Sequence, residues 1–210
     1  MSKQGQQLQT IRAIVIIAVV IILIFYWSRT AKKAPANSQI TTCGMPCGEE
    51  RWLVKTLMDQ DASKINFVPQ TATVAWLVSQ PAPSHLPQDS RIAPIETQTY
   101  SVHAQLVGYK LEKDHDIHIV IADLDHPDET MIVEIPSKDC ASACASPRLP
   151  DFEAARAIFD GRFGEPHEEF RRMSATVDVT GVGFFDYLHR QTGVAVNGIE
   201  LHPVLSIQFH

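Results

Sequence analysis

The longest uninterrupted apolar stretch of the chain lies near its beginning. Sixteen uncharged residues, rich in Ile, Val and Leu, separate Arg12 from Arg29. As a helix rising about 1.5 Å per residue, such a run is roughly 24 Å long, a little short of a hydrocarbon core of about 30 Å. The aliphatic stems of the two arginines can extend this length by snorkelling. The pattern predicts a single membrane-spanning anchor over 11–28, after a short tail over 1–10.

A cleaved signal peptide is the alternative explanation of this stretch. Ala34 and Ala36 have the small side chains of a cleavage site, but Pro35 lies between them and basic residues separate them from the apolar run. Both features are unfavourable for cleavage. Basic residues flank both ends of the anchor, so the positive-inside rule does not orient it. We expect the anchor to be retained and the large domain that follows it to be extracytoplasmic.

The residues between the anchor and the main domain change in character. Residues 29–46 are small and polar and are predicted to be a linker. Residues 47–95 are expected to form an N-terminal extension packed on the main domain. Within it, 49–60 has the pattern of a short helix, 71–79 fits either a strand or a helix, and the four prolines of 81–94 indicate an extended connector.

From residue 96 onward, apolar and polar positions alternate with the period of β-strands. A helix is predicted from Phe152 to about Asp160, capped by Asp151 and ended by Gly161. Three strands precede this helix and two follow it, over 100–111, 116–122, 130–135, 176–185 and 199–209. The order βββαββ is that of the OB-fold, a five-stranded Greek-key barrel. We therefore expect a mainly β protein with an OB-like barrel over 96–210; a sandwich or an open α+β sheet is the competing architecture.

Irregularities are expected in the last two strands. Gly181 and Gly183 lie inside the fourth strand, and Pro203 lies inside the fifth. Glycine within a strand is typical of a bulge or a sharp bend, and proline is confined to edges and bulges. The sequence thus predicts a bulge or a barrel bend in the fourth strand and an edge or a bulge at Pro203.

Charge divides the chain into two unlike parts. The first 33 residues carry five basic side chains and no acidic one, whereas the whole chain has a net charge of −6, which leaves −11 for residues 34–210. A domain this acidic is a poor ligand for nucleic acid, because its charge opposes that of the phosphate backbone. The basic first segment is instead suited to a membrane surface.

The four cysteines occur as two pairs with the same spacing. Cys43 and Cys47 have three residues between them, as do Cys140 and Cys144. An even number of cysteines in an exported domain favours disulfides, for which local bridges and cross-links between the pairs are both open. One zinc ion held by four thiolates is one alternative, and free or mixed thiols are the other.

Several segments resemble a widespread bacterial family with no assigned activity. The resemblance is carried by residues 47–57, 114–123, 130–136, 180–186 (TGVGFFD) and 191–205 (QTGVAVNGIELHPVL). It implies that 47–95 belongs to the same unit as the barrel and that the protein is bacterial. With the anchor, the expected location is the inner (cytoplasmic) membrane, crossed once, with a periplasmic domain. The barrel also invites comparison with nuclease-like OB domains, but their catalytic arginine and carboxylate pattern is not found here.

A repeated acid-x-His pattern is the most specific candidate for chemistry. Asp116 and His118 share one face of the second predicted strand, and Glu200 and His202 share one face of the last. The period of two places the Cα atoms of each pair about 6–7 Å apart. Together with Asp114, these side chains could bind a ligand or a divalent metal ion, and His118, His202 and Glu200 are the candidates for catalysis. The competing interpretation places them on the solvent-facing side of half-buried strands, or gives the histidines the role of fixing loops through hydrogen bonds.

Three functions remain open from these residues. The first is a membrane-anchored, extracytoplasmic binding or interaction module, whose partner could be an envelope protein or a glycan. The second is a metal-assisted, nuclease-like hydrolase that uses His118, His202 and nearby carboxylates. The third is a structural subunit of an envelope complex. The membrane, through the N-terminal helix, is a partner in all three, whereas nucleic acid is disfavoured by charge.

Overall fold

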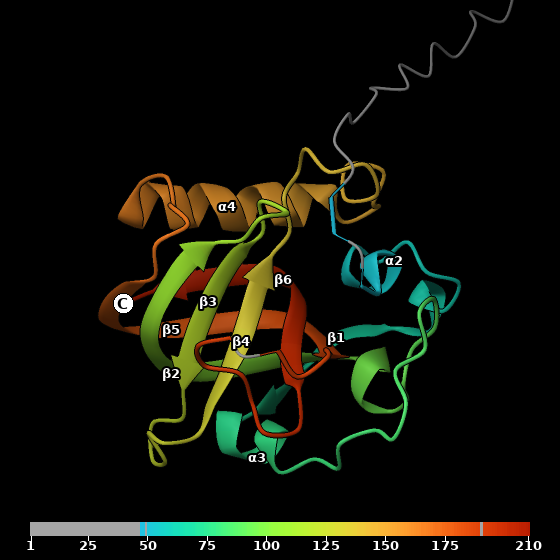
Figure 1. The fold of residues 1–210 in the computed structure, drawn as a ribbon, viewed down its shortest axis with the longest axis horizontal. Coiled ribbons are helices and arrows are strands. Elements are labelled where there is room, and N and C mark those ends of the chain that lie inside the picture. The colour runs from blue at the N-terminus through green and yellow to red at the C-terminus, as the bar shows by residue number, and fades with distance from the viewer. Residues whose placement is uncertain (1–46, 49, 190) are drawn as a thin grey trace, which may run out of the picture. The chain divides into compact units, whose positions relative to one another are not determined.

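Six β-strands form a single sheet in the part of the chain that the structure describes. The computed structural model describes residues 47–210 except 49 and 190. The strands are β1 (Asn66–Ala72), β2 (Gln98–Leu111), β3 (Ile117–Ala122), β4 (Thr130–Ile135), β5 (Arg171–Phe185) and β6 (Ile199–Phe209). Their order is β1-β2-β3-β4-β6-β5, and β2 also pairs with β5 (Figure 1). The expectation of a mainly β protein is confirmed.

The strand pairings form a closed circuit. β2 pairs antiparallel with β3, β3 with β4, β6 with β5, and β5 again with β2, whereas β4 and β6 run parallel. β1 lies outside this circuit and pairs parallel with the first residues of β2. Two registers matter below: His118 lies opposite Glu134, and Ile132 lies opposite Glu200. β4 therefore has a histidine-bearing strand on each side.

The helices are short except for one. They are α2 (Trp52–Lys55), α3 (Val74–Val78) and α4 (Leu149–Phe163), with 3-10 turns η1 (Ala62–Lys64) and η2 (Ile95–Thr97). α4 packs against β6 and β4 and lies across one end of the sheet, with α3 near the other end (Figure 1). The prediction that Gly161 ends α4 is wrong. The helix continues to Phe163 and ends before Gly164, whose φ of 76° suits glycine.

The segment before the first predicted strand differs from its prediction in two places. The helix expected over 49–60 is confined to the single turn of α2, and Leu57 has a left-handed φ of 61° that a helix cannot accommodate. Strand β1 was not predicted, because its exposed residues carry no alternation that could reveal it. Residues 71–79, whose sequence fits either a strand or a helix, contain both: the end of β1 and then α3.

Buried ion pairs attach this segment to the sheet. The Arg51 guanidinium is completely buried and donates to both carboxylate oxygens of Glu96, at 2.6 and 2.8 Å, and to the Phe185 carbonyl at 2.6 Å. Arg91 and Asp59 form a second fully buried pair at 2.7 Å. Breaking such a pair leaves an uncompensated buried charge, at a cost of about 3–5 kcal/mol. These contacts fix α2, which carries Lys55, against the strands.

A disulfide makes the same connection covalently. Cys47 is bonded to Cys140, which is 93 residues later in the chain. Cys144 is disulfide-bonded as well, and Cys43 lies outside the described residues. The prediction of disulfides is confirmed, and the bond cross-links the two cysteine pairs. The alternative of a zinc ion held by four thiolates is wrong, because Cys47 and Cys140 are bonded to each other.

The predicted irregularity in the last strands is present. The register between β5 and β6 shifts between Thr180 and Gly181 and again between Gly181 and Gly183. The second shift falls opposite the residues between Leu201 and Val204, which include Pro203. The bulge lies beside His202 and therefore helps to set the direction of that side chain.

The predicted anchor at 11–28 and its flanking tail and linker residues lie outside the described residues. Among the helices of residues 47–210, none is long and apolar enough to cross a membrane.

Candidate metal site

A buried glutamate on β4 is the centre of the candidate site. Glu134 Oε1 lies 3.0 Å from His118 Nδ1 of β3, and its Oε2 lies 3.2 Å from His202 Nδ1 of β6. Burial by itself would raise the pKa of Glu134, but the contacts with His118 and His202 outweigh it and hold that pKa well below its usual range. Glu134 is therefore an ionised carboxylate inside the protein.

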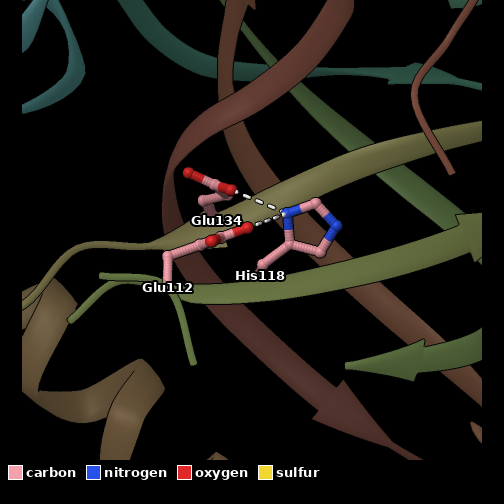
Figure 2. Close-up of side chains that lie close together, drawn as sticks. All are labelled: Glu112, His118 and Glu134. Carbon is pink, nitrogen blue, oxygen red and sulfur yellow. Dashed lines mark hydrogen bonds and ion pairs between the residues drawn. The ribbon is translucent and has the colours of Figure 1, made fainter. Parts of the chain in front are cut away.

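His118 is held in one orientation by contacts at both ring nitrogens. Its side chain is completely buried, and Nε2 lies 3.1 Å from the Thr192 carbonyl oxygen. A carbonyl only accepts hydrogen bonds, so Nε2 must carry the proton. Nδ1 faces Glu134 Oε1 at 3.0 Å and Glu112 Oε1 at 3.3 Å, as Figure 2 shows. The ring therefore directs one nitrogen at two carboxylates.

His202 lies between two buried carboxylates without well-aligned hydrogen bonds. Its Nε2 is 3.4 Å from Asp116 Oδ2, yet neither ring nitrogen meets hydrogen-bond geometry with any described residue. Burial lowers the pKa of His202, but the neighbouring Asp116 and Glu134 carboxylates outweigh it and raise that pKa. Asp116 Oδ1 in turn accepts a hydrogen bond from the backbone N–H of Ser137 at 2.7 Å. His202, next to Asp116, therefore lies beside the Oε2 atom of Glu134.

Two further ionisable groups border the cluster. Lys55 of α2 forms an ion pair with Asp186 at 2.8 Å. Burial alone would lower the pKa of Lys55, but the carboxylates of Asp186, Glu134 and Glu200 outweigh it and raise that pKa. Glu200 is almost completely buried, and burial together with the charge of Glu134 holds its pKa well above the usual range. Glu200 is thus the neutral carboxylic acid of the group.

An open cleft of about 430 Å³ reaches this cluster from the surface. Glu112, Glu134 and Lys55 are part of its wall, together with Cys47, Gly48, Glu50, Lys113, Asp114, Asp186, His189 and Gln191. Burial, with the charges of Asp116 and Glu134, raises the pKa of Asp114 to about 6. His118 and His202 do not line the cleft and lie behind the glutamates. A ligand that enters would therefore meet carboxylate oxygens first.

Two sets of side chains have the spacing of metal ligands. One is Glu112, His118 and Glu134; the other is Asp116, Glu134 and His202, and within each set the candidate ligand atoms lie within 4.8 Å of one another. With metal–ligand bonds of about 2.1 Å, two ligands lie roughly 3.0 Å apart in octahedral and roughly 3.4 Å apart in tetrahedral geometry. The His118 distances of 3.0 and 3.3 Å agree with these values. Glu112 and Glu134 of the first set line the cleft, whereas Asp116 and His202 of the second are buried and do not.

The structure brings together most of the residues chosen from the sequence, but in different pairs. Asp116 contacts His202 of the other motif, and no described contact joins it to His118. Asp114 lines the cleft, and Glu200 lies behind the cluster with Oε2 unpaired. The interpretation that these positions face solvent is wrong for Asp116, His118, Glu200 and His202, because all four are buried.

Sequence reasoning missed the two glutamates that complete the site. Glu134 is the one charged residue of β4, where its neighbours are apolar and buried. An acid inside an otherwise apolar strand was the available signal, since an ionised side chain is rarely buried without a partner. Glu112 follows the end of β2 and had no such signal.

Comparison of the chain with protein-family models, with curated proteins and with solved structures finds no match. What the site does must therefore be inferred from its own geometry and chemistry.

Proposed function

We propose that this protein is a membrane-tethered, extracytoplasmic OB-like binding module that holds a divalent transition-metal ion between Glu112, His118 and Glu134. The observation that carries this proposal is the orientation of His118. In the tautomer with its proton on Nε2, which the Thr192 carbonyl favours, the ring directs the Nδ1 lone pair at two carboxylate oxygens, 3.0 and 3.3 Å away. In that tautomer the three electron-rich atoms repel one another, and a cation bound between them would offset the repulsion.

A metal ion on Nδ1 of His118 would agree with the usual surroundings of a histidine ligand. A histidine that binds a metal through one nitrogen almost always donates its other N–H to a carbonyl or carboxylate, which fixes the tautomer. Thr192 supplies that carbonyl here. One imidazole and two carboxylates suit Zn²⁺ or Mn²⁺ better than the soft metals that prefer sulfur.

The charge around the site supports a cation with two positive charges. Two lysines beside the site, Lys55 and Lys110, are paired with Asp186 and Glu112 at 2.8 and 2.7 Å, and Lys113 lines the cleft. Besides the neutral Glu200, six carboxyl groups lie in or around the cluster and its cleft: Glu50, Glu112, Asp114, Asp116, Glu134 and Asp186. A divalent ion would offset this excess, and it would also lower the cost of keeping several carboxylates near one another.

The fold and location in this proposal rest on further observations. The closed circuit of pairings, the parallel β4–β6 pair and the position of α4 between β4 and β5 support an OB-like barrel. The apolar run between Arg12 and Arg29 supports the membrane anchor. The cross-linking disulfide supports an oxidising compartment.

Metal content and affinity test the proposal. The full chain, purified in mild detergent and stripped with a chelator, should bind one Zn²⁺ or Mn²⁺ in calorimetric titration. His118→Ala and Glu112→Gln should weaken that binding at least tenfold. His103→Ala is the matched control, because His103 is an exposed histidine on a carboxylate, 2.6 Å from Asp178. Absence of stoichiometric binding, or an equal loss in the His103 variant, would contradict the proposed site.

A further inference from the structure

The proposed metal ion would have an open side. Its three protein ligands come from the end of β2, from β3 and from β4. Two of them, Glu112 and Glu134, also form part of the wall of the cleft. Structural zinc sites are usually closed by four protein ligands, whereas three ligands and an open position are typical of hydrolytic sites. The ion would therefore be exposed to a molecule in the cleft.

Lys113 supplies a positive charge in the same cleft. It follows Glu112 directly, lines the cleft and is exposed. Lys55, in contrast, forms an ion pair with Asp186 at 2.8 Å. No ion pair joins Lys113 to any residue of the described part of the chain, so its ammonium group is available to a ligand. A metal ion and an ammonium group together are suited to a ligand with several anionic oxygens.

The cleft and the net charge limit the size of that ligand. A volume of about 430 Å³ is enough for a small molecule. A long polyanion would have to approach a domain whose residues 34–210 carry a net charge of −11. We infer that the metal site hydrolyses phosphate esters of small molecules, with Lys113 binding a phosphate oxygen. This inference rests on the proposed metal ion.

The reaction consumes one water molecule and needs no other reactant. A metal-bound water loses a proton to solvent, and the resulting hydroxide oxygen forms a bond to phosphorus. The bond between phosphorus and the ester oxygen breaks, and the leaving oxygen takes a proton from solvent. The products are an alcohol and inorganic phosphate, or a phosphate monoester when the substrate is a diester. Lys113 keeps its proton throughout and stabilises the negative charge on the phosphate oxygens.

Hydrolysis and phosphate binding test this inference on the metal-loaded full chain. p-Nitrophenyl phosphate and bis(p-nitrophenyl) phosphate are the substrates, and inorganic phosphate is the binding probe. Lys113→Ala should raise KM and the Kd for phosphate roughly tenfold, with metal affinity nearly unchanged. Lys113→Arg should restore most of the binding. The control is Lys138→Ala, because Lys138 is an exposed lysine paired with Asp139 outside this cleft.

The possible outcomes separate this inference from the proposed function. A chain that binds metal but neither hydrolyses these esters nor binds phosphate overturns the inference and leaves the metal site intact. A chain that binds no metal overturns both. Hydrolysis that is insensitive to Lys113→Ala, or equally sensitive to Lys138→Ala, overturns the role of Lys113.

Discussion

Replacing Glu134 with glutamine is the most direct perturbation of the site. The substitution keeps the shape of the side chain but removes its charge and one of its two acceptor oxygens. The native carboxylate lies 3.0 Å from His118 Nδ1 and 3.2 Å from His202 Nδ1. An amide can accept from one of these histidines, but its NH₂ group must then face the other.

The loss of stability in metal-free protein can be estimated from these contacts. A hydrogen bond to a charged group contributes about 1.5–3 kcal/mol, and breaking a buried charge pair costs about 3–5 kcal/mol. Part of the loss is offset, because burial opposes the charge of Glu134 and the neutral amide of glutamine avoids that cost. We therefore expect Glu134→Gln to lower the free energy of unfolding by about 2–4 kcal/mol.

Metal should widen the difference between wild type and variant. At a free concentration of about 100 times its Kd, a ligand that binds only the folded state adds about 2.7 kcal/mol of stability. The wild-type chain should gain this amount with ZnCl₂ or MnCl₂ over its value in EDTA. Glu134→Gln should gain almost nothing, because it lacks the ligand that both histidines share.

Urea denaturation followed by tryptophan fluorescence, with metal and with EDTA, measures both effects. Asp59→Asn is the matched control, because Asp59 is also a buried carboxylate, paired with Arg91 at 2.7 Å. It should lose a comparable amount of stability and keep the full gain from metal. The reasoning would be refuted if Glu134→Gln gained as much from metal as wild type, or if Asp59→Asn lost the gain.

Three further predictions concern the stability of the domain. Cys47→Ser combined with Cys140→Ser opens a cross-link spanning 93 residues and should lower the free energy of unfolding by up to about 4–5 kcal/mol, which urea titration under oxidising conditions can measure. Gly161→Ala should raise the melting temperature, because a Cβ there meets nothing within 4 Å and alanine is about 0.5–1 kcal/mol more favourable than glycine in a helix. Gly183→Ala should lower the melting temperature, because its Cβ would collide with a backbone carbonyl. Asp114 has a pKa raised to about 6, so the metal-free fold binds its proton more tightly than the unfolded chain and loses stability as the pH rises from about 4 to 6. Screening at this part-exposed group reduces the loss to roughly 1–2 kcal/mol, and Asp114→Asn should remove it in urea titrations across that range.

The strands of the sheet could be predicted because their signal is local. β3 and β4 are short and largely apolar, and β6 alternates along most of its length, so each strand is visible in its own residues. β1 was missed because six of its seven residues are exposed and its partner is a parallel strand distant in the sequence. The end of α4 was misplaced because Gly161 has open space around it and does not have to end the helix.

The candidate site could be predicted only in part, for a related reason. The acid-x-His spacing identified His118, His202 and Asp116 as residues of interest. It paired each histidine with an acid of its own strand, whereas the structure pairs them across strands through Glu134. A repeat along one strand shows which side chains share a face, but it does not show which strand lies beside it.

The sequence by itself determined the mainly β composition of the domain, the helix between the third and fourth of its five predicted strands, and the residue types available for chemistry. These follow from side-chain periodicity and turn residues, which act over a few positions. Only the tertiary structure decided that β4 lies between β3 and β6, that the polar side of β3 is buried, and that Glu112 and Glu134 face one imidazole nitrogen. Register and burial arise from packing between segments far apart in the chain, and no local pattern records them.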